Sequence, residues 1–556
     1  MRKQLKCDVF LNFKRLFLIS SLILIAASLQ AAELTKETAS DFQTLYPGVL
    51  TKKEKALVEK FISDNKLIEE RGKIDMKAMI NGTLPEDTPG YVRSLKITGA
   101  MVRYFNELRD PENPLLNNAE YAKKAGYQDI IAYPTLAAHD DSFMAPYPTK
   151  ARDTLLVSDL IHHVTYYRPV YPGDTLYWVV NSRHFNDLTP ETGSIYRSLA
   201  MVNNGSVYNH RGEKILDVSY TVQENIKVYK EGQAPKNPTF NDMWEEREST
   251  PGGGGAGPGA GASSATYYYT NEDWKILKEL WSKEKRQGAT PLYWEDVKIG
   301  DQPTWTLDGP LDAGATVAVP WGMGLGGCRT LKKDILDPGI FKTLVRSETD
   351  GIYRPANEDD YILPIPKEAQ TGQSFGEVGA MDAQLGGPVG GPGGAPGGAP
   401  GGPGGGPGGP PAGAPGGAPG GDSGNSGKVG LMAFSRRDYA IRHISDWMGD
   451  SGQLHSISWG ALYTKDMVVP GEPGPVVNPE TDTFRDKAPK ELLKAPNVLG
   501  EGKGDNKFVI IRSYVCDKYV RDGDFFVELI WWIDTISGNN SGEGRATVKL
   551  PSRKAK

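Results

Sequence analysis

The chain has 556 residues, of which 38% are hydrophobic and 24% are charged, so it can bury a core and wholesale disorder is excluded. This length predicts about two to four domains. The formal net charge of −6 offers no basic surface for a polyanion, and nucleic acid is therefore not expected as a partner.

The amino terminus has the composition of a targeting segment. Five basic residues precede an apolar run at 16–27, and the small residues Ala31 and Ala32 follow it. This order is typical of a secretory signal peptide, which we assign to residues 1–32. The run is shorter than the roughly 20 apolar residues of a bilayer-spanning helix, although an uncleaved anchor is the alternative. We expect a periplasmic or secreted protein with no membrane span after signal cleavage.

A polar, helix-prone stretch follows the signal peptide. Apolar residues recur at helical spacing over 51–62, behind Thr51 as a possible cap, which predicts a helical extension over 33–89. From 90 to 230 the pattern indicates a helix, a turn-rich segment, a second helix and then strands. Expected strands flank a Pro-Gly-Asp turn within 165–180 and occupy 194–203 and 214–224, with turns at 203–205 and 210–212.

A linker separates this first unit from a second. Residues 231–290 contain a glycine-rich stretch at 251–262 and a pattern that predicts a helix at 274–286. The second unit is predicted over 291–552. Its interruption at 386–428 is expected to be a disordered surface insert, because residues 386–427 alone contain 22 glycines and 10 prolines. A helix at 435–449 and strands at 508–517, 525–537 and 544–550 complete the second unit.

The two units share one order of parts. Each has an opening segment, then a central helix, then a meander of strands. This order predicts an α+β chain built from two units, each a bent antiparallel sheet around a central helix.

Several motifs indicate a family. The segments 110–116, 120–127, 131–136 and 168–176 resemble the MaoC-like dehydratases, which include the R-specific enoyl-CoA hydratases and have the hotdog fold. In the second half, 293–301, 447–452 and 542–551 are similar to double-hotdog members. The resemblance extends over residues 90–230 and over parts of 291–552. It implies that water is added or removed across a carbon–carbon double bond next to a carbonyl or thioester.

Such chemistry needs a base–acid pair and hydrogen-bond donors for the enolate oxygen. The resemblance implies an Asp-x-Asn-Pro-hydrophobic-His pattern. Here Asn113-Pro114-Leu115 keep that frame, but Leu116 stands where the histidine is expected, and Asp110 lies one residue further from Asn113 than the pattern asks. A leucine cannot transfer a proton.

The expected site residues follow from that frame. Asp110 and Asn113 are assigned to hold the water, and His139, early in the helix after Pro134, is assigned as a substitute base. Tyr133, Pro134 and Thr135 are expected to bind substrate, with the helix start at Pro134 and Thr135 holding the oxyanion.

Two alternatives stay open. The reactive site can lie in the second half instead, with contributions from His443, Asp446, Asp450 or His455. Otherwise the chain is a catalytically silent ligand-binding or scaffold protein, in which Asp110 and Asn113 serve only turn formation before a proline.

A less favoured interpretation is a dinucleotide-binding oxidoreductase. Residues 322–327 read Gly-x-Gly-x-x-Gly after an apolar run. Pro320 interrupts the required strand, however, and the surrounding units are mainly antiparallel.

No Cys-x-x-Cys or paired histidine spacing indicates a metal, and no cofactor is expected. Cys328 and Cys516 remain after signal cleavage, either as a disulfide or as two thiols.

The expected partner is a small acyl or enoyl compound. Coenzyme A thioesters are cytosolic metabolites, whereas the signal peptide directs this chain outward, so the consistent substrate is an exported compound that is not a coenzyme A ester. A double unit supplies both halves of a hotdog pair within one chain. A monomer that mimics a dimer and a homodimer of such chains are both compatible with this arrangement.

Overall fold

The structure of the chain is a computed structural model. It describes residues 52–138, 156–187, 196–227, 267–311, 327–328, 330–357, 362–363, 433–460, 489–505, 507–538 and 540–554. The predicted signal peptide at 1–32, the glycine-rich part of the predicted linker and the predicted insert at 386–428 lie outside the described residues.

Ten strands form one antiparallel sheet in the order β1-β3-β4-β5-β2-β11-β14-β13-β12-β6. The strands of the first half are β1 (Tyr91–Lys96), β2 (Leu156–Tyr166), β3 (Thr175–Asp187), β4 (Tyr196–Asn209) and β5 (Lys214–Lys227). Those of the second half are β6 (Thr306–Asp308), β11 (Gln453–Gly460), β12 (Val509–Arg521), β13 (Asp524–Thr535) and β14 (Asn540–Lys549). Two small two-stranded sheets are formed by β7 (Gly327–Cys328) with β10 (Ile362–Leu363), and by β8 (Leu344–Arg346) with β9 (Tyr353–Pro355).

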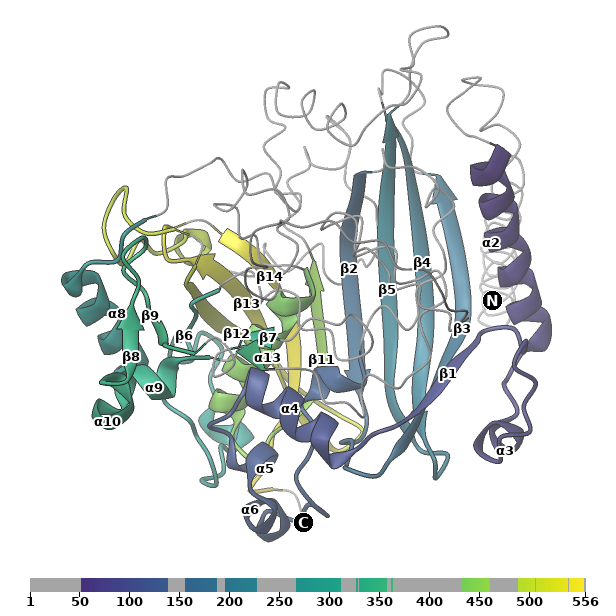
Figure 1. Cartoon of the computed structure of the whole chain (residues 1–556). Helices are drawn as coiled ribbons and strands as arrows, with labels where there is room; N and C mark the ends of the chain where they lie inside the picture. Colours follow the sequence, from purple (N-terminus) through teal and green to yellow (C-terminus); the bar gives the residue numbers. More distant parts are fainter. Residues whose placement is uncertain are drawn as a thin grey trace, which may run out of the picture.

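The two halves of the large sheet have the same topology. From the outer edge to the middle of the sheet, the first half has the order β1-β3-β4-β5-β2 and the second half has the order β6-β12-β13-β14-β11. In both halves the strand that comes second along the chain therefore lies at the middle of the sheet, next to the strand that comes last. The halves meet where β2 pairs with β11, from Ser456 opposite Thr165 to Gly460 opposite Ile161. We call this pair of strands the seam. The two predicted antiparallel units are therefore joined into one continuous sheet by main-chain hydrogen bonds (Figure 1).

One predicted turn is wrong. Residues 203–205 lie inside β4, and Asn203 pairs with Arg183 on one side and Tyr220 on the other. Asparagine and glycine favour turns, but here two neighbouring strands supply ladder partners, and the Asn203 side-chain oxygen also accepts from Arg183 Nε at 3.1 Å. The real turn follows Asn209, where the predicted residues 210–212 are found.

Helices of different lengths lie around the sheet. The first part of the chain contains α2 (Lys52–Arg71), α3 (Met76–Ile80), α4 (Gly99–Arg109), α5 (Pro114–Asn117), α6 (Ala119–Lys124) and the short 3₁₀ turn η1 (Pro134–Leu136). The second part contains α8 (Asn271–Lys283), η3 (Trp294–Asp296), α9 (Lys332–Leu336), α10 (Pro338–Phe341), α13 (Ala433–Met448) and η7 (Lys490–Leu493). No helix in the described part of the chain is long and apolar enough to cross a membrane.

The main core lies on the face of the sheet that carries α13. Ala440, Ile441 and Ile444 of this helix are fully buried and pack in one cluster with Leu454 and Ile457 of β11. The same cluster continues into α4 and the strands of the first half, so a single core crosses the seam. The core therefore fixes α4 and α13 against each other.

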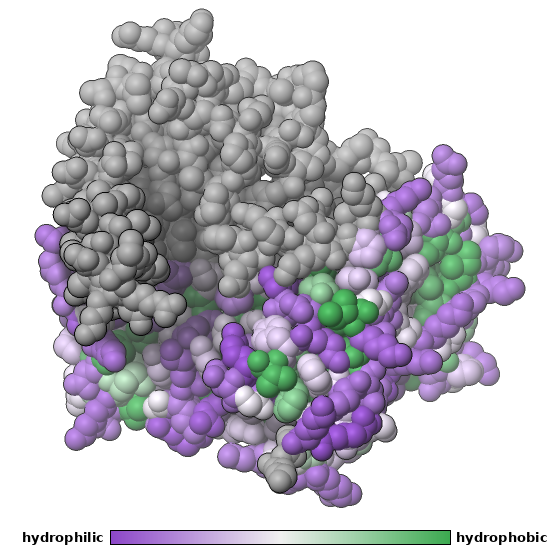
Figure 2. All heavy atoms as spheres, turned by 180° about the vertical axis from the view of Figure 1, so that it is seen from behind, coloured by the Kyte–Doolittle hydropathy of each residue, from purple (hydrophilic) through white to green (hydrophobic). Residues whose placement is uncertain are grey.

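Two further groups of elements flank the sheet at its ends. Helix α2 packs along β3, where Asn65 accepts a hydrogen bond from the Arg183 backbone at 2.8 Å (Figure 1). At the other end, α8 packs on β6 through a separate aromatic cluster that includes Trp274, Trp281 and Phe508. Seen from the side opposite to Figure 1, the described surface is mostly hydrophilic, with smaller hydrophobic patches between (Figure 2).

Candidate functional site at the seam

The segment that contains Asp110 and Asn113 turns sharply after α4. Asp110 ends the helix, and Asn113 caps α5 by accepting from the Leu115 backbone at 3.1 Å. Pro114 suits the first position of that short helix because it has no N–H to satisfy. The Asn113 amide nitrogen also donates to Asp110 Oδ2 at 3.1 Å, and both side chains are buried. The structure thus brings together the two residues assigned to hold water.

Leu116 occupies a core position rather than a site position. Its side chain is buried in the main cluster, and its carbonyl accepts from Asn106 Nδ2 at 2.7 Å. The Asn106 side chain also receives the Tyr133 backbone N–H at 2.8 Å. The buried amide of Asn106 therefore holds two stretches of the first half together, and Leu116 contributes packing there.

Asp110 is paired with a cation from the second half. Arg286 Nη2 lies 2.6 Å from Asp110 Oδ1 and 2.7 Å from Asp446 Oδ1. Asp446 belongs to α13, and its own carbonyl accepts the Gln287 backbone N–H at 2.7 Å, which fixes the arginine segment against the helix. Two buried carboxyl groups, one from each half of the chain, therefore share a single guanidinium nitrogen.

The charged cluster extends along α13. Arg442 lies 2.6 Å from Asp308 and 2.9 Å from Glu284, and its Nε is 4.0 Å from Asp446. Lys332 then joins Glu284 at 2.7 Å to Glu112 at 2.8 Å. We call this set the seam network; its members are Asp110, Glu112, Glu284, Arg286, Asp308, Lys332, Arg442 and Asp446. It contains five carboxyl groups and three cations.

Burial shifts the pKa values of several carboxyl groups in this network. Burial raises the pKa of Asp446 to about 7, with Asp110 adding to the rise and Arg286 opposing it. Burial likewise raises the pKa of Asp308 to about 6, although Arg442 opposes it. For Glu112, burial acts upward, but Lys332 outweighs it and the net pKa is lowered. The seam network therefore keeps a proton near neutral pH, and Asp446 is the group that holds it most readily.

Of the three expected substrate-binding residues, Tyr133 lies close to this network and to α13. The Tyr133 hydroxyl donates to the Asp438 carbonyl of α13 at 2.5 Å, and burial keeps its pKa well above the ordinary value. Tyr133 thus connects the halves. Thr135 is also buried, and its hydroxyl has no hydrogen-bond partner among the residues described here. Pro134 begins η1, which spans only Pro134–Leu136.

The histidines fall in different places. His139 lies outside the described residues. His443 faces the sheet, where Thr306 is 3.2 Å from Nδ1 and Ser513 is 2.8 Å from Nε2. Burial, together with the nearby Arg442 charge, lowers the pKa of His443 to about 3, so it is neutral and structural. His455 lies on the opposite face of the sheet.

Asp450 is also outside the seam network. It accepts the Tyr121 hydroxyl at 2.5 Å, and the hydrogen bond raises the pKa of that tyrosine. Of the four alternatives in the second half, only Asp446 thus meets Asp110 through a shared partner.

Cys516 donates through its Sγ to the Glu528 carbonyl at 3.6 Å, and the side chain of Cys328 lies outside the described residues.

Sequence analysis missed the cations of the network. Asp438, Arg442 and Asp446 recur every four residues, which places them on one stripe of α13. That spacing indicates a charged face on this helix and could have been recognised in the sequence. Arg286, in contrast, follows α8 in an irregular segment, where no periodic spacing indicates its role. In the described part of the chain, no group of histidine, cysteine, aspartate and glutamate side chains is arranged to hold a metal ion.

Comparison with known proteins gives a structural likeness at low sequence identity. No family model and no curated protein matches the sequence. Among solved structures, the chain is similar to a MaoC-like dehydratase, with 10% identity, a TM-score of 0.34, and 83% of this chain and 98% of that chain covered. It is also similar to a conserved protein of Mycobacterium tuberculosis with a double hotdog fold, with 9% identity, a TM-score of 0.35, and coverage of 83% and 94%.

A shorter match concerns an (R)-hydratase from A. caviae, which is involved in PHA biosynthesis. It has 17% identity and a TM-score of 0.18, and it covers 23% of this chain and 89% of that chain. The solved structures that the chain matches thus include the class of protein that its sequence motifs resemble.

Proposed function

We propose that the chain is a hydratase or dehydratase in which Asp110 and Asp446 form the acid–base pair. The observation that carries this proposal is the contact of both carboxyl groups with one nitrogen of Arg286. Two carboxyl groups held this close, with one pKa raised to about 7, can divide the roles of base and acid near neutral pH. Asp446 supplies the second proton-transfer group that Leu116 cannot.

In hydration, Asp110 takes a proton from water as the water oxygen bonds to the β-carbon. Asp446 gives its proton to the α-carbon, and solvent then restores the two protonation states; dehydration follows the same steps in reverse. Asn113 orients Asp110 through its 3.1 Å hydrogen bond. The Thr135 hydroxyl, buried and without a partner among the described residues, is the donor for the developing enolate oxygen.

We also propose that the substrate comes from outside the cytosol. The basic flank and apolar run of residues 1–32 support export, and an exported enzyme would act on an unsaturated or hydroxylated carbonyl compound other than a coenzyme A ester. Mass spectrometry of the mature amino terminus, combined with cell fractionation, tests export independently of activity. An intact residue 1 in the cytosolic fraction would contradict it.

The activity test uses purified mature chain with a crotonyl thioester and with simple enoates. We expect Asp110→Asn and Asp446→Asn each to lower kcat/KM by about 100-fold or more, because each removes a proton-transfer group. Asp296→Asn is the matched control, since Asp296 pairs with Arg553 at 2.6 Å on the surface. Activity should also decline as pH rises through about 7, because the acid must be protonated.

A second candidate is a catalytically silent ligand-binding or scaffold protein. It is favoured by the burial of Leu116 in the core at the position where the resemblance implies a histidine. Absence of hydration with every enoyl compound tested, in protein that is folded by circular dichroism, would support this function. A measurable rate that survives in Asp446→Asn but is lost in His139→Ala would instead assign the second proton-transfer role to His139.

A further inference from the structure

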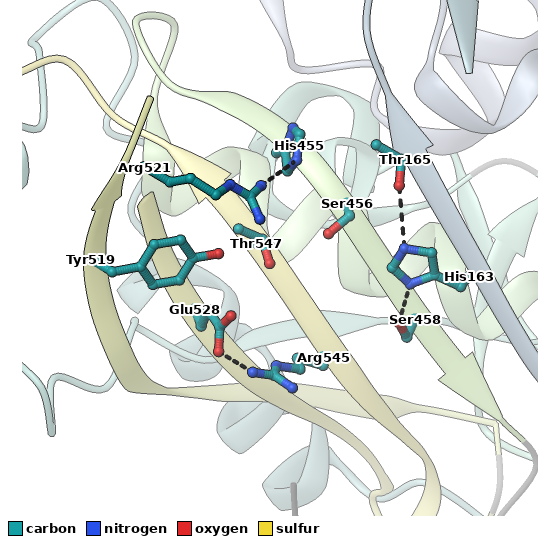
Figure 3. Close-up of a pocket in the computed structure, with 10 residues that line it drawn as sticks. All are labelled: His163, Thr165, His455, Ser456, Ser458, Tyr519, Arg521, Glu528, Arg545 and Thr547. Carbon is teal, nitrogen blue, oxygen red and sulfur yellow. Dashed lines mark hydrogen bonds and ion pairs between the residues drawn. The ribbon is translucent and has the colours of Figure 1, made fainter. Parts of the chain in front are cut away.

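The outer face of the sheet contains a polar hollow directly behind the seam. Its volume is about 530 Å³, and five neighbouring strands, β2, β11, β14, β13 and β12, all contribute side chains to it (Figure 3). This volume falls in the range of small-molecule sites. We call it the outer groove. It lies on the face opposite to α13, so it is separate from the seam network.

Strand register builds the groove in two rows. Ser458 of β11 lies opposite His163 of β2 and Arg545 of β14. One step along the sheet, Ser456 lies opposite Thr165 and Thr547 in the same way. Paired residues of neighbouring strands share one face of a sheet, so both rows face the groove.

An irregularity in β11 adds a further side chain. The register shifts between Leu454 and Ser456, and the extra residue is His455. Leu454 faces the core, whereas His455 and Ser456 both line the groove (Figure 3). A bulge of this kind re-aims a side chain without ending the strand.

The hydrogen bonds inside the groove hold its polar groups in place. Ser458 Oγ lies 2.6 Å from His163 Nδ1, and Thr165 Oγ1 lies 3.2 Å from His163 Nε2. Arg545 forms an ion pair with Glu528. Each hydroxyl can both donate and accept, so the serine and threonine rows retain hydrogen-bonding capacity for a ligand.

Arg521 differs from Arg545, which forms an ion pair with Glu528. Among the described residues, no carboxylate forms an ion pair with Arg521. Its guanidinium carbon lies 5.1 Å from the ring centre of Phe526 and its Nη2 is 3.5 Å from His455 Nε2. Tyr519 stacks on the same Phe526 ring, with 5.4 Å between ring centres. The aromatic pair thus supports an arginine whose charge is available at the end of the groove.

We propose that the outer groove binds a small oxyanion that also carries hydroxyl groups. Arg521 would hold the carboxylate or phosphate group, which its planar fork suits. The serine, threonine and histidine side chains of the two rows would hydrogen-bond the hydroxyl groups. Neither the resemblance to the dehydratases nor the proposed reaction uses this face, so the proposal stands apart from the proposed function.

Isothermal titration calorimetry on the full mature chain tests this proposal at low ionic strength. The probes are citrate for a carboxylate source, glucose 6-phosphate for a phosphate source, and glucose as the uncharged comparison. We expect at least one anion to bind in the micromolar to millimolar range and glucose to bind at least about tenfold more weakly. Binding by citrate alone or by glucose 6-phosphate alone identifies the source of the anionic group.

Variants locate the binding. Arg521→Gln should weaken the anion about tenfold or more, because Arg521 is exposed at a strand end and can be replaced without disturbing the core. Ser458→Ala should weaken it about fivefold. Arg553→Gln is the matched control, because it removes an arginine away from the groove, and should change affinity less than twofold.

Three outcomes would overturn the proposal. The first is that none of the probes binds, and the second is that glucose binds as tightly as the anions. The third is that Arg553→Gln weakens binding as much as Arg521→Gln, since this would indicate general attraction to surface charge. Hydratase activity is not a readout in these measurements, so failure here leaves the proposed function untouched.

Discussion

The two faces of the sheet at the seam differ sharply, although the same strands build both. On one face, Ile457 of β11 is fully buried against α13, and the charged groups beyond it form the paired seam network. On the other face, the next residue, Ser458, belongs to the polar outer groove. Successive side chains of a strand point to opposite faces, so a single residue step separates a dry core from a polar hollow.

The difference shows how burial decides the role of a charge. Arg442 is buried and Arg286 is half-buried, and both lie among buried carboxyl groups. The free energy of unfolding therefore depends on keeping these ion pairs intact. Arg521 is exposed and has aromatic and histidine neighbours, so its charge can serve a ligand instead. Charges on the helix face should therefore control stability and protonation, and charges on the outer face should control binding.

The largest expected effect is the loss of Arg286. Arg286→Gln leaves Asp110 and Asp446 buried without their shared cation, and it should lower the free energy of unfolding by about 3–5 kcal/mol. Urea denaturation followed by circular dichroism measures the change. Arg553→Gln, which breaks an exposed ion pair with Asp296, should cost no more than about 1 kcal/mol. Equal losses in the two variants would remove the distinction between buried and exposed charges.

The second-largest loss of stability is expected when a core side chain at the seam is shortened. Ile457→Ala removes a fully buried side chain from the cluster that joins the halves, and it should cost about 2–5 kcal/mol by the same measurement. Thr165→Ala, on the neighbouring strand but facing the outer groove, is the comparison and should cost about 1 kcal/mol or less. A larger loss for the threonine variant would mean that the outer face carries the packing.

A smaller effect concerns pH. The pKa of Asp446 is about 7 in the folded chain, whereas an unfolded aspartate titrates near 4, so the folded state binds more protons between these values. The free energy of unfolding should therefore fall as pH rises through this window, by roughly 1–3 kcal/mol. Asp446→Asn cannot titrate, so the decline should become shallower in that variant, and the remaining part is the contribution of Asp308, whose pKa is raised to about 6. An unchanged slope would show that another group takes up the proton.

The smallest effect is expected from Ser458→Ala. It removes the 2.6 Å contact with His163 on the outer face, at a cost of about 1 kcal/mol to the free energy of unfolding. The same substitution should also weaken anion binding about fivefold. Thermal unfolding with and without citrate separates the two, and loss of stability alone would assign this serine to the sheet.

The sequence predicted most of the strands and helices of the second half, but it predicted less of the chemistry of the site. The strands at 508–517, 525–537 and 544–550 and the helix at 435–449 correspond to β12, β13, β14 and α13, because apolar periodicity records which face is buried. The turn expected at 203–205 failed because turn-forming residues in β4 are outweighed by ladder partners on both sides. The turn preference of a short segment does not show which neighbouring strands will pair with it.

The site was only partly accessible to the same reasoning. The motif containing Asp110 and Asn113 was visible, and Asp446 was among the alternatives considered for the second half. Their meeting through Arg286 was not, because 176 positions separate that arginine from Asp110 along the chain. The outer groove was equally hidden: a register shift that adds one residue to β11 places His455 on the outer face, and no composition signal marks such a shift.

The pairing of β2 with β11 has a consequence for any attempt to divide the chain. Each half produced alone would expose one of these strands as a bare sheet edge, with unpaired main-chain groups ready to recruit another copy. A gene fragment encoding only the first half should therefore self-associate or precipitate. Co-expression with the complementary fragment should return it to solution, since the natural partner edge would then compete for the same hydrogen bonds.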